Sequence, residues 1–116
     1  HDALQISRVV TETADFVRFL GDAPVCILAF LLRTEYEMPI PAIQSVAAAI
    51  ENMLLTATDK GLGSCWLTAP LAGGVGQEVH DMFAPDKGEL VAMITLGHAA
   101  QTPAMPRRKE GRYIIV

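Results

Sequence analysis

The sequence predicts one domain in which helices are layered on a central β-sheet. The chain has 116 residues, a length that suits a single hydrophobic core, and 51% of its residues are hydrophobic. Stretches with apolar residues at helical spacing alternate with continuous apolar runs. The predicted order is therefore helix, strand, helix, strand, helix, strand and a tail. Elements of this kind bury their apolar faces by packing in layers, which is the architecture we expect.

The first helix and the first strand are predicted in the N-terminal part of the chain. Apolar residues recur at helical spacing over residues 6–20, and Gly21 stands where a glycine commonly ends a helix. The continuous apolar run at 24–32 predicts a strand that is buried on both faces. Residues 33–41 carry charges and two prolines, so we expect a loop there.

The clearest element is a long helix, predicted over residues 42–60 and ended by Gly61. The alanines at 47–49 let another backbone approach closely, so we expect this helix at the centre of the fold or at a subunit interface. A short strand over 64–68 and a Pro/Gly-rich loop over 69–74 are predicted to follow.

The last predicted elements are a helix, a strand and a tail. An amphipathic helix beginning at Val75 is expected to stop before Pro85, and an apolar strand over 90–96 is expected to end at Gly97. In the tail, residues 113–116 are strongly β-prone but have no predicted partner strand. Pairing with another subunit would cover the edge that they expose.

Composition and charge exclude two classes of partner. The chain has 9 basic and 13 acidic residues and a net charge of −4, so we expect no nucleic-acid partner. Its longest uninterrupted apolar run, residues 23–32, is shorter than the ~20 residues that a membrane-spanning helix needs. We therefore expect no membrane partner either.

The cysteines and histidines predict no metal site. Cys26 and Cys65 lie in apolar runs, and we expect both to be small buried side chains in a reducing, cytoplasmic environment. Two thiols cannot complete a zinc site, and the three histidines lack metal-ligand spacing. His98 directly follows a strand end, a position that often faces a ligand, so both a ligand contact and a solvated side chain stay open.

The motifs for nucleophilic catalysis and for nucleotide binding are incomplete. Ser64 does not lie in a GxSxG motif, and residues 73–76 resemble a phosphate cradle but lack the third glycine of the dinucleotide fingerprint. The pair Arg107 and Arg108 is the strongest chemical feature, because arginine binds phosphate in a bidentate manner. The alternative for this pair is a solvated surface.

Several distinctive segments follow one another along the chain. They are Ala23-Pro24-Val25, residues 45–55, Gly61-Leu62-Gly63-Ser64-Cys65-Trp66, Ala69-Pro70-Leu71, Ile94-Thr95-Leu96-Gly97-His98 and residues 103–109. In sequence and spacing they resemble the FMN-dependent nitroreductase family. The resemblance covers most of this chain but only the C-terminal portion of a usual family member. It implies an α+β fold of the three-layer α/β/α sandwich type, in an intertwined homodimer with FMN sites at the subunit interface.

The resemblance also implies which residues bind FMN. They form a loop against the flavin ring, a strand end beside the cofactor and a tail that holds the phosphate: Pro70, Leu71, Ala72 and Gly73, then Gly97 and His98, then Arg107 and Arg108. The implied activity is an oxidoreductase that passes hydride from NAD(P)H through flavin N5 to nitroaromatic or quinone-like acceptors. Because the cofactor carries this chemistry, no catalytic side chain is expected.

Two departures from the family leave alternatives open. Residues 1–116 are expected to form a single, incomplete nitroreductase-like domain that lacks the family's N-terminal helix and its arginine motif. The segment 33–41 is shorter than the one that often shapes the substrate pocket in relatives. The alternative to an enzyme is a non-catalytic flavin-binding or interaction protein with the same fold. Relatives that carry out dehalogenation, flavin fragmentation or cofactor maturation give a third possibility.

Overall fold

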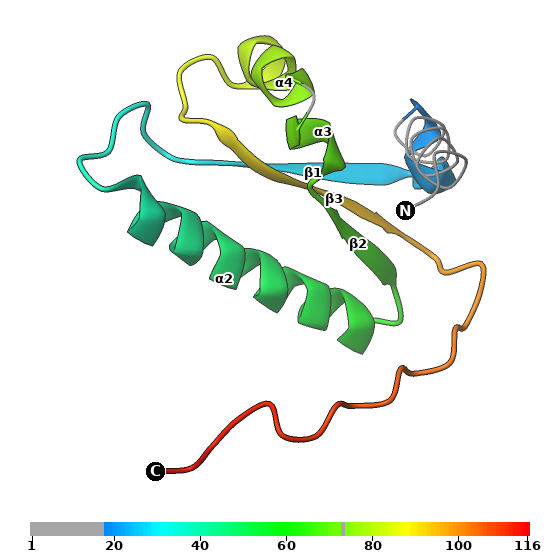
Figure 1. Ribbon diagram of the computed structural model, residues 1–116. Helices are drawn as coiled ribbons and strands as arrows, with labels where there is room; N and C mark the ends of the chain where they lie inside the picture. Colours follow the sequence, from blue (N-terminus) through cyan, green and yellow to red (C-terminus); the bar gives the residue numbers. More distant parts are fainter. Residues whose placement is uncertain (1–17, 73) are drawn as a thin grey trace, which may run out of the picture.

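The computed structural model describes residues 18–72 and 74–116 of the chain (Figure 1). The described elements, in chain order, are η1 (Leu20–Asp22), β1 (Val25–Phe30), α2 (Pro39–Asp59), β2 (Gly63–Leu67), α3 (Ala69–Ala72), α4 (Val75–Phe83) and β3 (Leu90–Gly97). Most of the helix predicted over residues 6–20 lies outside the described residues. The remaining elements combine helices with an antiparallel sheet, which makes the fold α+β.

The sheet is built around its last strand. The strand order is β1-β3-β2, and β3 pairs antiparallel with both neighbours. Strands β1 and β2 therefore run parallel to each other on either side of β3, and the long helix α2 connects them. Each of these outer strands has only β3 as a neighbour among the described residues, so its other edge is open.

Helix α2 covers one face of the sheet, and the core lies between them. Ile50 of α2 packs with Ala92 and Ile94 of β3, and all three are almost fully buried. The register places Ile27 of β1 and Trp66 of β2 opposite Ile94, so these three side chains share the face that α2 covers. Figure 1 shows α3 and α4 on the other side of the sheet from α2.

The ends of α2 follow ordinary helix chemistry, although the predicted start is wrong. The loop predicted over 33–41 ends at Met38, because Pro39 and Pro41 occupy the first helical turn, where a missing N–H costs no hydrogen bond. At the other end, Gly61 adopts φ = +74°, the left-handed conformation that the sequence predicts for a glycine after a helix.

The strands and α4 confirm the pattern-based predictions, whereas two other predictions are wrong. Residues 69–72 form the short helix α3 instead of a loop. Strand β1 is not buried on both faces, because Val25 is 47% exposed and the rest of the strand is only partly buried. The reason is its position at the edge of the sheet. Residues 113–116 are exposed and, among the described residues, pair with no strand.

Much of α2 faces outward. By length and composition this 21-residue helix could cross a membrane, and only 11% of its most apolar window is buried in the chain. One side of the helix packs on the sheet through Ile50 and Ala57, while Ile40 and Leu55 are 64% and 60% exposed. This outer surface is apolar and small-sided, which is typical of a helix that packs against another protein surface.

His80 attaches α4 to the segment that leads into β3. Its Nε2 lies 2.8 Å from the backbone carbonyl oxygen of Lys87, and its Nδ1 lies 2.9 Å from Oδ1 of Asp81. The ring also packs on Phe30 of β1, with 6.3 Å between ring centroids. Only the doubly protonated imidazole can donate to both oxygens at once. The carbonyl of Lys87, together with the carboxylate of Asp81, therefore raises the pKa of His80.

This arrangement predicts that stability decreases at alkaline pH. A raised folded-state pKa means that the contribution of His80 is fully present below its ordinary pKa of about 6.5, and is lost as the pH rises through the folded-state pKa. The lowered pKa of Asp81 acts only at acidic pH, so it adds no slope in this window. Urea unfolding should show that the wild-type protein loses stability as the pH is raised from about 5.5 to about 9. The loss over the same pH range should be smaller in His80→Gln.

His98→Gln is the matched control, because His98 is an exposed histidine without these contacts. The control should keep the pH dependence of the wild-type protein. An equal loss of stability in wild type and in His80→Gln would contradict the role of His80.

Candidate functional site

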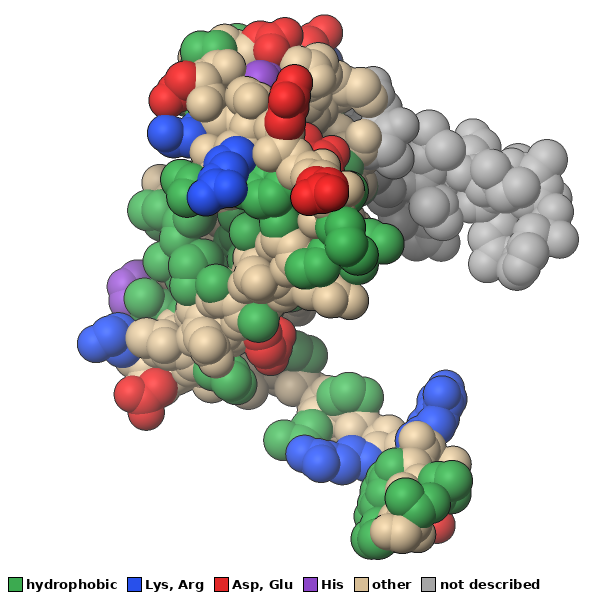
Figure 2. All heavy atoms as spheres, turned by 90° about the vertical axis from the view of Figure 1, so that its left-hand side faces the viewer, with side chains coloured by type: hydrophobic (Ala, Val, Ile, Leu, Met, Phe, Trp, Pro, Cys, Tyr) green, Lys and Arg blue, Asp and Glu red, His purple; other side chains and the backbone are tan. Residues whose placement is uncertain are grey.

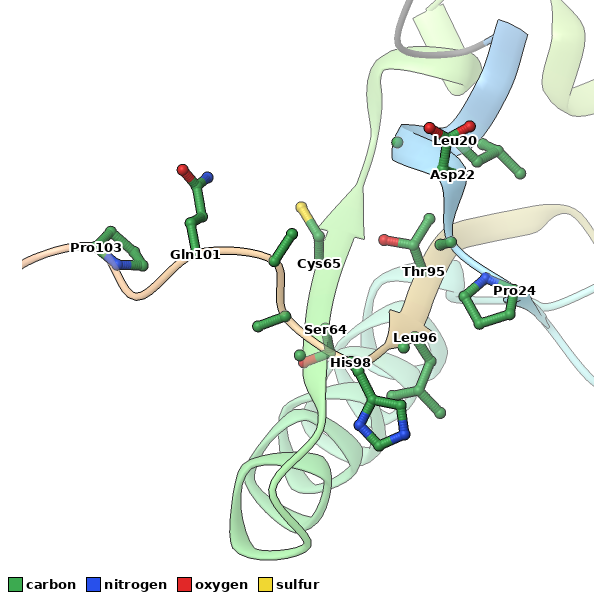
Figure 3. Close-up of a pocket in the computed structure, with 16 residues that line it drawn as sticks. Leu20, Asp22, Pro24, Ser64, Cys65, Thr95, Leu96, His98, Gln101 and Pro103 are labelled. Atoms are coloured by element: carbon green, nitrogen blue, oxygen red, sulfur yellow. The ribbon is translucent and has the colours of Figure 1, made fainter.

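An open cavity of about 530 Å³ lies at the end of the sheet where β3 finishes (Figure 3). We call it the strand-end cavity. It is lined by residues 20–24, 63–65, 95–101 and Pro103, which come from η1, the first residues of β2, and the end of β3 with the chain after it. Its volume lies within the range of about 300–1,000 Å³ that small-molecule sites usually have.

One wall of the cavity is a left-handed turn. Leu20, Gly21 and Asp22 all have positive φ, at 50°, 61° and 58°. Gly21 was predicted to end a helix, but it lies inside η1, and its two non-glycine neighbours share its left-handed conformation, which costs roughly 1 kcal/mol or more for each of them. The turn carries the chain into β1, and the N–H of Ala23 donates to the carbonyl of Leu20 at 3.1 Å.

The end of β3 passes so close to β1 that it requires glycine. A Cβ at Gly97 would lie 2.7 Å from Cδ of Pro24, well inside van der Waals contact. A Cβ at Gly63 would lie 3.2 Å from that of Ala99, a tight approach on the other side of the cavity. These two glycines therefore let the backbone itself form part of the cavity lining.

The floor of the cavity is formed by side chains of β3 and β2. Thr95 pairs with Cys65 on one side and with Cys26 on the other, so the three side chains share the face opposite α2. Thr95 is only 6% exposed, whereas Cys65 is exposed and lines the cavity. The prediction that both cysteines are buried is therefore wrong for Cys65. Cys26 is half-buried, and that burial raises its pKa.

Two of the predicted site residues line this cavity. Gly97 and His98 both contribute to it. Figure 3 shows, however, that the His98 side chain points to the same side as Leu96, away from Cys65 and Thr95. Residue 98 therefore faces the cavity mainly with its backbone, and the ring is exposed.

The other predicted residues lie elsewhere in the chain. Pro70 is buried in α3, and Leu71 lines a separate hollow of about 190 Å³ beside His80. The backbone of Ala72 ends α3, and Gly73 lies outside the described residues. Of the predicted site residues, Gly97 and His98 thus line the strand-end cavity, whereas those of α3 do not.

Arg107 and Arg108 lie in the exposed tail and do not line the cavity. Figure 2 shows basic and apolar side chains of the tail standing apart from the body, while acidic side chains gather at the end that carries α4. A second hollow, of about 640 Å³, is lined by Glu35, Glu37 and Glu89 and would repel an anionic ligand. The strand-end cavity is the better candidate for an anionic cofactor.

The lining fits the ring system of FMN better than its phosphate. Small backbone surfaces, Thr95 and Cys65 suit a flat ring with polar edges. In contrast, Asp22 is the acidic residue of the lining, and no Lys or Arg side chain from residues 18–72 or 74–116 lines the cavity. A phosphate dianion requires cationic donors, and the arginines of the tail are the candidates for that role. In the described part of the chain, no cluster of three His, Cys, Asp or Glu residues could hold a metal ion.

Neither Thr95 nor Cys65 was predicted from the sequence to line a binding site. Residues 90–97 read as an apolar strand, and such a run does not show which side chains face the core. The one available signal is that Thr95 carries the only hydroxyl in β3.

Comparison with known proteins agrees with the motifs. A sequence model described as the Nitroreductase family matches residues 4–98. The match includes the segments around Pro70 and Gly97, and it ends before the tail that carries Arg107 and Arg108. No curated protein sequence matches the chain significantly.

Proposed function

Because this chain belongs to the nitroreductase family, we propose that it binds FMN in the strand-end cavity and acts as a flavin-dependent oxidoreductase. The family supports flavin-dependent oxidoreductase activity in general. The observation that carries the proposal for this chain is the cavity itself, which has the size of a cofactor site and lies where the matched segments around Gly63 and Gly97 meet. Bound FMN would supply hydride transfer between NAD(P)H and a nitroaromatic or quinone-like acceptor.

The residues of the chain bind and orient the cofactor. Gly63 and Gly97 let the backbone approach the ligand, and the floor at Thr95 and Cys65 supports a flat ring. Helix α3 packs against β3 on the side of the sheet that carries Thr95 and Cys65. An exposed free thiol at Cys65 favours a reducing, cytoplasmic location.

A homodimer completes this proposal. The outer side of α2 is apolar and exposed, and Tyr113, Ile114 and Ile115 are at least 80% exposed in the single chain. A second copy that packs on α2 and receives the tail would cover both surfaces and give the three-layer sandwich of the family. The same tail would bring Arg107 and Arg108 to an FMN phosphate.

The alternative is a non-catalytic flavin-binding or interaction protein. One observation favours it: no Lys or Arg side chain of the described residues lines the cavity. This alternative shares the fold and the dimer, but in it NAD(P)H does not reduce a bound flavin.

The role of the tail predicts the effect of a double substitution. Replacing Arg107→Ala and Arg108→Ala should weaken FMN binding at least about tenfold, because charge-assisted hydrogen bonds to the phosphate are lost. Fluorescence titration with FMN measures the affinity, and riboflavin, which lacks the phosphate, should bind equally well to both proteins. The double variant Arg33→Ala and Arg112→Ala removes the same charge and should bind FMN normally. Unchanged FMN affinity in the variant that lacks Arg107 and Arg108 would show that these arginines are solvated surface residues and do not bind the phosphate.

The exposed apolar surfaces predict the oligomeric state. Sedimentation velocity at micromolar concentration should show a dimer, because exposure of the apolar side chains on the outer side of α2 to water is unfavourable. Replacing Leu55→Glu, at an exposed position of α2, should shift the protein toward monomer without unfolding it. A wild-type monomer at these concentrations would contradict the proposed assembly.

A further inference from the structure

Helix α4 buries little of its surface against the rest of the protein. None of its residues is buried, and its side chains Val75, Met82 and Phe83 are exposed. The hollow of about 190 Å³ beside His80 is lined both by residues of α4 and by Leu90 at the start of β3. An element with few buried apolar contacts opens locally at a low free-energy cost, so the polar contacts of α4 decide how firmly it is held.

One side chain makes the polar attachment of α4. Among the described residues, His80 is the α4 side chain that hydrogen-bonds outside its own helix, through the 2.8 Å contact of Nε2 with the carbonyl oxygen of Lys87. On the other side of the ring, Oδ1 of Asp81 lies 2.9 Å from Nδ1 and accepts from Nε2 of Gln77 at 2.8 Å. The His80 side chain is only 15% exposed and packs on Phe30. Both ring nitrogens therefore face oxygen atoms.

The charged groups around the ring favour its protonated form. The hydrogen bond to the carbonyl of Lys87, the hydrogen bond and charge of Asp81, and the charge of Asp86 together raise the pKa of His80. Glu89, in the segment that leads into β3, lines the same hollow as the ring. The cation of that segment, the ammonium group of Lys87, lies 3.0 Å from Oδ2 of Asp86. Strand β1 and helix α3 contribute apolar side chains beside the ring.

Loss of the proton weakens the attachment of α4. A neutral imidazole has one N–H, so one of the two oxygens then faces a lone pair of the ring. If the N–H points to Asp81, the carbonyl of Lys87 loses its donor. If it points to Lys87, that hydrogen bond is no longer charge-assisted, and Nδ1 faces the carboxylate of Asp81. Either neutral form of His80 holds α4 less strongly than the imidazolium ion does.

The backbone at both ends of α4 can accommodate an opening. Gly74, directly before the helix, adopts φ = +77°, and a Cβ there would meet no other atom within 4 Å. Ala84, directly after the helix, has left the helical conformation, with φ = −148°. The core of Ile50, Ala92 and Ile94 lies on the other side of the sheet, between β3 and α2 (Figure 1). Opening of α4 therefore leaves this core packed.

We propose that His80 is a pH-sensitive switch, in which the protonated ring holds α4 against the sheet and loss of the proton lets the helix open locally and reversibly. Leu71 of α3 lines the hollow beside His80, so the opening also uncovers a predicted FMN-binding residue. This effect on the cofactor site rests on the proposed function, whereas the opening itself does not. The switch is therefore tested on the FMN-free protein.

Hydrogen–deuterium exchange with peptide mass spectrometry measures the opening. After correction for the chemical exchange rate at each pH, the amides of residues 79–83 should lose about three- to tenfold in protection between about pH 6 and about pH 9, because a charge-assisted hydrogen bond becomes a neutral one. The amides of β3 should keep their protection, since the core stays packed. Nitrogen NMR of the imidazole should show both ring nitrogens protonated at the lower pH.

Three variants separate the switch from a purely structural role. His80→Gln has no side chain that titrates in this range, so its α4 should show weak protection that does not change with pH. Asp81→Asn removes the charge beside Nδ1, which lowers the pKa of His80 and should move the loss of protection to lower pH. His98→Gln removes an exposed histidine without these contacts and should behave as the wild-type protein does.

Four results would overturn the inference. They are equal protection of wild-type α4 at both pH values, a loss of protection with pH in His80→Gln as large as in wild type, an unchanged pH dependence in Asp81→Asn, and a loss of protection in β3 together with α4. The last result would show global unfolding and no local opening. Because FMN takes no part in the test, failure of the switch leaves the proposed function standing, and a protein that binds no FMN leaves the switch standing.

Discussion

The position of β3 between its two neighbours is the constraint on which the rest of the structure depends. It alone among the described strands is paired on both sides, and its alternating side chains serve two different purposes. Ile94 faces α2 and fills the core, while Thr95 faces the strand-end cavity. A shift of one residue in the register would exchange these two side chains, which would bury a hydroxyl in the core and remove the polar floor of the cavity.

Glycines at both ends hold this strand in place. A Cβ at Gly88 would collide with the carbonyl oxygen of Arg33, and one at Gly97 would press on Pro24. The N–H of Gly88 donates to the carbonyl of Leu31, and His80 binds the carbonyl of the preceding residue, Lys87. Strand β3 thus connects α4, which contacts the segment before the strand, with the strand-end cavity, which lies where the strand finishes.

Much of the fold could be predicted from the sequence, because the spacing of apolar residues identifies long helices and strands, and glycines mark where they end. Helix α4, strand β3 and most of α2 follow from apolar spacing, and Gly61 ends α2 in the expected conformation. The first turn of α2 was missed because prolines indicate a loop unless the start of the helix is known. Helix α3 was missed because four residues are too few to show a period.

The candidate site was harder to predict, since it depends on which strands are neighbours. The backbone role of Gly97 follows from its position at a strand end, but the side on which the His98 ring lies depends on the local backbone. Thr95 and Cys65 become neighbours only through the antiparallel pairing of β2 with β3. Arg107 and Arg108 lie in an exposed tail, and their contact with an FMN phosphate depends on the proposed second copy of the chain.

The most direct test of the central claim is the visible absorption spectrum of the protein after FMN is added and the excess removed, recorded without oxygen before and after NADH or NADPH. The account predicts a bound-flavin spectrum that bleaches when the nicotinamide is added. A protein that retains no flavin would contradict the assignment of the strand-end cavity to FMN. Retained flavin that stays oxidised would contradict the oxidoreductase and leave a non-catalytic flavin-binding protein.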